Sequence, residues 1–184
     1  MDQVCVFPLD GVVLFPTTTL PLYLFEPRYL QMFKDAVQNK RPIAICPTAP
    51  FKGKIVGYGH PALIQQRDDG TQAIVIRGQG RARLVRPVQA EPFWIYEIQD
   101  EPYADQIEPG QQFVVNRMRR QLQQWAEKEI PLADQRSALL ESLHHPRLVL
   151  ESLAMLQLKD PDVRQKILEF NDINEAIQFV MPLL

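Results

Sequence analysis

The spacing of apolar and polar residues changes twice along the chain, and its first stretch is almost entirely apolar. Between residues 7 and 29, Pro8, Pro16, Pro21 and Pro27 cut this stretch into pieces too short for a helix. Proline lacks the amide donor and holds the preceding residue in extended geometry. We therefore expect short buried strands joined by fixed corners, and then a helix over residues 26–40, because proline suits a first helical turn.

The middle of the chain predicts a strongly bent sheet. Asp69-Gly70 separates two extended runs and is typical of a hairpin turn, since both positions tolerate positive φ. Gly78 and Gly80 predict a bulge or bend, at which either of them could take positive φ, and Gly57 and Gly59 predict a close approach of two backbones. The expected strands cover residues 43–46, 55–65, 72–76, 81–85 and 93–98.

From residue 111 onward the apolar residues recur about every 3.6 positions, which predicts helices. Asp160 and Asp172 are typical N-cap residues, and the polar, proline-flanked segment 101–109 reads as a boundary. We expect a β-rich subdomain over 1–100 and a helical subdomain over 101–184. The predicted helices are 111–129, 133–143, 147–158, 161–170 and one after Asp172. The stripe predicted to be buried on the first is Val114, Met118, Leu122, Trp125 and Glu129.

Composition restricts the class of protein further. The 184 residues carry a net charge of −2, so no global attraction to nucleic acid or anionic lipid is expected. Cys5 and Cys46 lie in apolar runs and are predicted to be buried, reduced thiols. The N-terminus has no basic leader and no run approaches a membrane-spanning length, so we expect no membrane partner and a cytoplasmic location.

Motifs for catalysis or cofactor binding are missing from the sequence. Gly53-Lys54 is followed by Ile55 and lacks the earlier glycine of a phosphate-binding loop. His60 and the pair His144-His145 have no cysteine or histidine partners at metal-ligand spacing. We expect no cofactor, no metal site and no catalytic residue.

Two segments carry residues in an order typical of one protein family. The first runs from Pro8-Leu9 to Phe15-Pro16 and is followed by Leu20-Pro21-Leu22. It resembles the pattern P-L-x-x-V-V-x-F-P followed by x-P-L in the substrate-recognition domain at the N-terminus of Lon proteases. The ending Phe25-Glu26-Pro27-Arg28-Tyr29 resembles the version found in stand-alone members. The second segment, from Val56-Gly57 through Asp69-Gly70 to Arg81-Ala82-Arg83, is similar to the spaced glycines and arginines of the same family.

The resemblance covers essentially the whole chain, since residues 164–169 are also similar to a helical stretch of that domain. It implies an α+β fold: a bent, β-barrel-like subdomain of the PUA type with one helix, followed by a C-terminal helical bundle. Periodicity alone predicts only a bent sheet followed by helices. The resemblance also implies no catalysis, because the ATPase and Ser-Lys peptidase modules of full Lon have no room in 184 residues.

By the same resemblance, the expected function is recognition of unfolded or apolar polypeptide, or of a protein partner. An adaptor or regulator role in protein quality control is one form that this function takes. Large apolar residues left exposed would form such a surface. The candidates for peptide or partner binding are Phe15, Phe51, Trp94 and Tyr96.

An RNA- or nucleotide-binding module is the alternative, because PUA-like sheets often have that function. It requires Arg81, Arg83 and Arg86 to converge with Trp94 or Tyr96 as a stacking platform. The other interpretation of these arginines is a solvated sheet face whose side-chain stems cover apolar neighbours, and we favour it over nucleic-acid binding.

Overall fold

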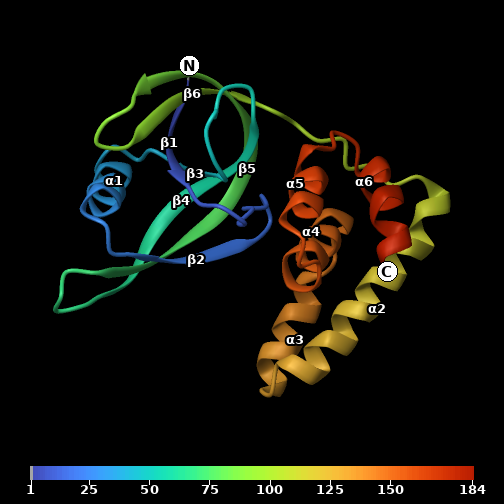
Figure 1. The fold of residues 1–184 in the computed structure, drawn as a ribbon. Helices are drawn as coiled ribbons and strands as arrows, with labels where there is room; N and C mark the ends of the chain where they lie inside the picture. The colour runs from blue at the N-terminus through green and yellow to red at the C-terminus, as the bar shows by residue number, and fades with distance from the viewer. Residues whose placement is uncertain (1) are drawn as a thin grey trace. The chain divides into compact units, whose positions relative to one another are not determined.

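The computed structural model describes residues 2–184 and divides the chain into two compact units, Met1–Pro102 and Tyr103–Leu184. The first holds the sheet and one helix, and the second holds the remaining helices (Figure 1). The α+β class is thereby confirmed.

The elements of the first unit follow the predicted ranges closely. The helix expected over 26–40 is α1, and the two strands expected over 72–76 and 81–85 are one continuous strand, β5. The bounds are β1 Gln3–Pro8, β2 Thr19–Leu24, α1 Pro27–Gln38, β3 Ile43–Cys46, β4 Ile55–Gln66, β5 Gln72–Gln89 and β6 Trp94–Asp100.

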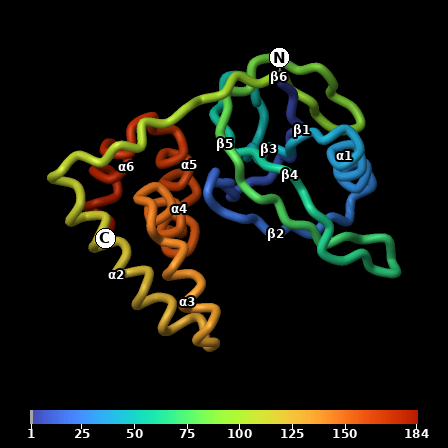
Figure 2. The backbone as a smooth tube through the Cα atoms, turned by 180° about the vertical axis from the view of Figure 1, so that it is seen from behind, coloured from blue at the N-terminus to red at the C-terminus, as the bar shows by residue number. Residues whose placement is uncertain are grey.

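Strand β5 organises a six-stranded sheet in the order β2-β5-β4-β3-β1-β6. It is 18 residues long: its first part pairs with β2 on one side and β4 on the other, and its last part pairs with β6. The additional β5–β6 pairing joins the last strand of the order to the second, so the sheet curls back on itself (Figures 1 and 2). Pairing is antiparallel except between β1 and β3.

Glycines make the curl possible through close approach. A Cβ on Gly57 would lie 1.7 Å from the carbonyl oxygen of Leu14, and one on Gly78 would lie 2.1 Å from that of Phe15. The expected bulge is present: Tyr58 pairs with Gly80 but Gly59 pairs with Gly78, so one residue of β5 is left over. Neither Gly78 nor Gly80 takes positive φ at this bulge, because the backbone there stays extended.

The hairpin between β4 and β5 turns where the sequence predicts. Gly70 takes a φ of +86°, and its amide donates to the carbonyl of Arg67 at 3.0 Å. Asp69 keeps a negative φ and accepts hydrogen bonds from the Thr71 amide and hydroxyl instead. The tip of this hairpin projects from the rest of the sheet (Figure 2).

The core of the sheet unit contains both cysteines, as predicted, as free thiols. Burial, with a smaller contribution from the Asp35 carboxylate, raises the pKa of Cys5 to about 12. Burial raises the pKa of Cys46 to about 11. Neither thiol is therefore a nucleophile at neutral pH.

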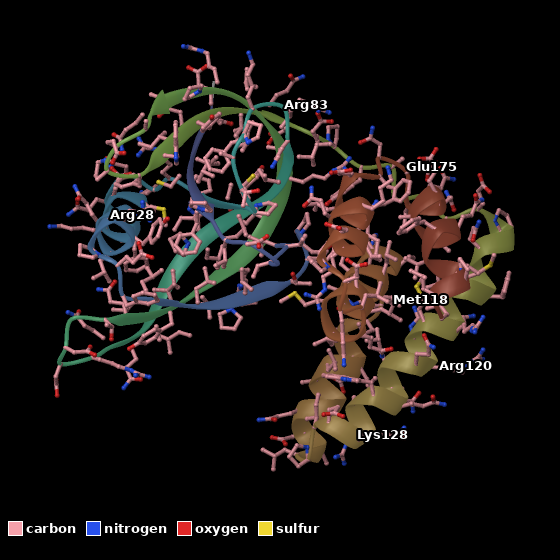
Figure 3. The ribbon with its side chains drawn as sticks, viewed as in Figure 1. Arg28, Arg83, Met118, Arg120, Lys128 and Glu175 are labelled. Atoms are coloured by element: carbon pink, nitrogen blue, oxygen red, sulfur yellow. The ribbon has the colours of Figure 1, made fainter. Side chains whose placement is uncertain are left out.

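The second unit contains five α-helices within the described residues. Asp160 and Asp172 cap their helices, as predicted, by accepting from the amides two residues ahead. Val114, Met118 and Leu122 are buried along α2 (Met118 in Figure 3), whereas Trp125 is half-buried and Glu129 is exposed, which corrects the last part of the predicted stripe. The bounds are α2 Gln112–Glu129, α3 Ala133–Ser142, α4 Pro146–Gln157, α5 Pro161–Glu169 and α6 Ile173–Val180, with short 3₁₀ turns at Pro109–Gln111 and Met181–Leu183.

Side chains of the helical unit contact the segment that the sequence predicts to be the boundary. Arg147 of α4 is buried, pairs with Asp105 at 2.7 Å and stacks on the Tyr103 ring, with its Cζ 3.8 Å from the centroid. The Asn174 side chain of α6 accepts from the Glu108 amide at 2.9 Å and donates to the Gln106 carbonyl at 2.8 Å. A polar segment is thus fixed by polar side chains that helical periodicity does not reveal.

Candidate functional site

The four aromatic residues predicted to bind a partner mostly lie in the core. Phe15, Phe51 and Tyr96 are buried, and Trp94 alone is half-buried. Phe51 contacts Trp94 and Tyr96 edge-on, with ring centroids 5.6 and 6.0 Å apart. Three of the candidates, Phe15, Phe51 and Tyr96, therefore do not present an exposed ring, and Phe51 and Tyr96 belong to the core cluster of the sheet unit.

Arg81 is also buried, and it is neither a phosphate contact nor part of a solvated face. Its side chain is 2% exposed and donates to the carbonyls of Glu101 at 3.0 Å and Pro102 at 3.2 Å. A guanidinium can be buried in this way because its fixed donors satisfy main-chain oxygens. Arg81 thus ties the end of β6 to β5.

Each of the two other arginines of the predicted nucleic-acid face forms an ion pair with a glutamate. Arg83 pairs with Glu101 at 2.7 Å and donates to the Gly53 carbonyl at 3.0 Å (Arg83 in Figure 3). Arg86 pairs with Glu97 at 2.6 Å. Each positive charge has a carboxylate beside it, and the neighbouring rings pack on one another. The convergent basic platform of the alternative prediction is not formed.

A hollow of about 270 Å³ opens where β1, β2 and the start of α1 meet. Phe25, 63% exposed, and the exposed Tyr23 line it together with the partly buried Leu22. Its other lining residues come from the end of β1 and the residue after it, the end of β2, and the N-cap and first turn of α1. They are Phe7, Pro8, Leu9, Leu24, Glu26, Arg28 and Tyr29. We call this hollow the Phe25 groove.

Local sequence explains the position of each wall of the Phe25 groove. Glu26 caps α1 through its backbone, accepting from the amides of Tyr29 at 3.0 Å and Leu30 at 3.1 Å, and Pro27 begins the helix. Tyr29 then turns inward onto Phe7, with ring centroids 4.4 Å apart. Arg28 covers the Tyr29 ring at 4.8 Å and pairs with Glu26 at 3.0 Å (Arg28 in Figure 3).

A second, smaller hollow of about 60 Å³ continues the groove towards Trp94. The two hollows share Pro8, Arg28 and Tyr29, and the second is closed by Pro92 and Trp94. Trp94 is therefore the one predicted site residue that lines a hollow adjoining the Phe25 groove. Trp, Tyr and Arg are the side chains most often found at the centres of protein interfaces.

Sequence reasoning missed Phe25, Tyr23 and Leu22 as site residues. The ending Phe25-Glu26-Pro27-Arg28-Tyr29 carried the signal, since it places an aromatic residue directly before the proline that starts a helix. A side chain at that position follows the last residue of β2 and precedes the first turn of α1, so neither element covers it. The exposure of Phe25 could have been inferred from this corner.

The Phe25 groove is lined mainly by apolar and aromatic side chains. Its ionisable side chains are Tyr23, Glu26, Arg28 and Tyr29, and burial raises the pKa of the Tyr29 phenol. Across residues 2–184, no three histidine, cysteine, aspartate or glutamate side chains gather as metal ligands would. In that same range, no helix is long and apolar enough to cross a membrane.

Residues 3–184 match the family of the ATP-dependent protease La (LON) substrate-binding domain. The chain belongs to this family. Lon protease 2 of Desulfotalea psychrophila is 25% identical over 190 residues, covering 96% of this chain and 24% of the relative. The Lon protease of Escherichia coli K12 is 23% identical over 194 residues, covering 99% of the chain and 24% of the relative.

Solved structures show the same fold over the whole chain. The Lon N-terminal domain protein from Xanthomonas campestris superposes with a TM-score of 0.77 at 20% identity, covering 100% of this chain and 99% of that one. The N-terminal domain of Mycobacterium avium complex Lon protease gives 0.75 at 14% identity, covering 98% and 97%. The chain spans about a quarter of the length of the curated Lon proteases it matches.

Proposed function

We propose that this LON-family chain is a non-catalytic recognition module that binds apolar segments of unfolded polypeptide in the Phe25 groove. The observation that carries the proposal is Phe25 itself, a large apolar side chain 63% exposed at the rim of a hollow lined by aromatic residues. Exposed apolar surface beside a concavity is typical of an interaction site. An adaptor or regulator role in protein quality control is compatible with such binding.

The curled sheet supports this function as a rigid frame. We propose that the sheet is barrel-like, of the PUA type, and that the helical unit is a bundle around a core of its own. Apolar burial contributes roughly 25 cal/mol per Å² to binding, and ordering a flexible peptide offsets much of this. We therefore expect affinity in the micromolar range with little dependence on salt.

The test measures binding of a reduced and alkylated, permanently unfolded protein by fluorescence anisotropy at low and high salt. Phe25→Ser should weaken binding about tenfold, because one apolar anchor is lost. Phe113→Ser is the matched control, since Phe113 is also 63% exposed but lies on α2, outside the groove. The control should bind as the parent chain does.

A single-stranded RNA probe is titrated in parallel. Binding of RNA would weaken steeply as salt rises, whereas polypeptide binding would not. The proposal is wrong if only RNA binds and Arg83→Glu with Arg86→Glu abolishes that binding. It is also wrong if Phe25→Ser and Phe113→Ser have equal effects on the unfolded protein.

A further inference from the structure

A second concave surface lies within the helical unit, between the later turns of α2 and the end of α4. Its volume is about 360 Å³. Trp125 and Leu156 supply its apolar part, and Lys128 and Lys159 supply its charge. We call it the Trp125 groove. Helical spacing explains the α2 wall, because Gln121, Trp125 and Lys128 follow one another at intervals of four and three residues.

The charged side chains that line the Trp125 groove are all positive. Two lysines line it and no carboxylate does, while the remaining lining side chains are glutamines. Among residues 2–184, neither Lys128 nor Lys159 has a carboxylate within ion-pair distance. Both ammonium groups are therefore available to an anion from outside.

The carbonyl groups near the end of α4 accept hydrogen bonds from a side chain other than these lysines. Arg164 donates to the Ala154 carbonyl at 3.1 Å and to the Met155 carbonyl at 3.0 Å, so the end of α4 is already covered. Gln157 donates to the Gln121 carbonyl at 3.2 Å and fixes α4 against α2 at the base of the groove. The apolar part is equally open, because Trp125 is half-buried and Leu156 is exposed.

We propose that the Trp125 groove binds an acidic peptide segment that carries an apolar side chain. The apolar side chain packs on Trp125 and Leu156, and carboxylates on either side of it pair with Lys128 and Lys159. This site lies in the other unit from the Phe25 groove and differs from it in chemistry. The inference does not depend on the function proposed above.

A short acidic peptide fits better than a nucleic acid. Residues 103–184 contain more acidic than basic residues, so a long polyanion would meet repulsion beyond the groove. A peptide that reaches only the groove meets the two lysines and the glutamine amides. Carboxylate with ammonium and alkyl with indole are thus the contacts that this surface can satisfy.

The test uses a synthetic peptide with a central leucine flanked by glutamates, and a control peptide with glutamines in their place. In a Trp94→Phe background Trp125 is the only tryptophan, and its fluorescence reports binding to the full chain. The acidic peptide should change this fluorescence saturably, and the glutamine peptide should bind at least about tenfold more weakly.

Charge reversal locates the site. Lys128→Glu with Lys159→Glu should weaken the acidic peptide about tenfold or more, since two attractions become repulsions. Arg120→Glu is the matched control, because Arg120 is exposed on the same helix but does not line the groove (Figure 3). Its effect should stay within about twofold.

Three results overturn the inference: equal binding of both peptides, equal effects of the lysine and Arg120 variants, or displacement of the peptide by single-stranded RNA that binds more tightly. Phe25→Ser provides the remaining comparison. It should leave the acidic peptide unaffected while it weakens the unfolded protein, so failure at one groove is distinguishable from failure at the other.

Discussion

Replacing Gly57 with alanine tests whether the curled sheet depends on close approach of two backbones. An added Cβ would lie 1.7 Å from the carbonyl oxygen and 2.7 Å from the carbonyl carbon of Leu14. Real Cβ atoms essentially never come within 3.0 Å of another heavy atom, so the Leu14 carbonyl must retreat by the difference, about 1.3 Å. Leu14 is fully buried, and its main chain cannot move without disturbing its side chain.

The cost follows from what must move. Overfilling a packed interior costs about 1 to 3 kcal/mol, and more where the surroundings cannot yield. A main-chain atom beside a buried leucine lies at the upper end of this range, so we expect Gly57→Ala to lower the free energy of unfolding by about 3 kcal/mol. Gly70→Ala is the matched control: its Cβ meets open space, but its φ of +86° costs alanine only about 1 kcal/mol.

Urea denaturation in a Trp125→Phe background measures both variants through Trp94, which packs on the core of the sheet unit. With an m-value of about 1 to 3 kcal/mol per molar urea, Gly57→Ala should lower the midpoint by about 1 M or more. Gly70→Ala should lower it by about a third as much. If Gly57→Ala costs no more than Gly70→Ala, close approach is not the reason for glycine at position 57.

Two further predictions concern buried ionisable groups. The free energy of unfolding should fall above about pH 9, by up to about 1.4 kcal/mol per pH unit for each thiol, because burial raises the pKa of Cys5 from 9.0 to about 12 and that of Cys46 from 9.0 to about 11. Urea denaturation of Cys5→Ala/Cys46→Ala at a series of pH values should show a shallower fall, and an unchanged slope would contradict this. Arg147→Ala should destabilise the helical unit by about 2 to 4 kcal/mol, since Asp105 loses its buried partner, whereas the exposed Arg120→Ala should change stability by less than about 0.5 kcal/mol in thermal unfolding followed by Trp125 fluorescence.

The helices could be predicted nearly to the residue because their ends carry local signals. Asp160 before Pro161 and Asp172 before Ile173 fix the start of α5 and α6 through side-chain caps that need no tertiary contact. Strand positions were predictable from β-branched residues and from the Asp69-Gly70 turn, although glycine or proline also lies inside β2, β4 and β5. What alternation could not show was that β5 runs unbroken past its bulge. It also could not show that β1 pairs with β6 and β2 with β5, because strand partners far apart in sequence leave no local mark.

The site was harder to predict than the fold, because exposure depends on packing that no local pattern records. Arg81 and Arg83 alternate as a solvated face would, yet Arg81 is drawn inside by the carbonyls of Glu101 and Pro102. Phe51 lies in a loop and still enters the core. Phe25, in an apolar run that suggested burial, is left outside by the turn into α1.

The two segments that carry the family resemblance are parts of one packing arrangement. The carbonyls of Leu14 and Phe15, from the first segment, occupy the spaces left by the missing side chains of Gly57 and Gly78, from the second. This contact places the N-terminal segment against β4 and β5. Four motif residues are accounted for by that packing, namely Leu14, Phe15, Gly57 and Gly78. Phe25 is not, since 63% of its side chain contacts no other part of the structure. An apolar side chain that folding does not require, placed at the rim of a hollow, is the one whose presence binding has to explain.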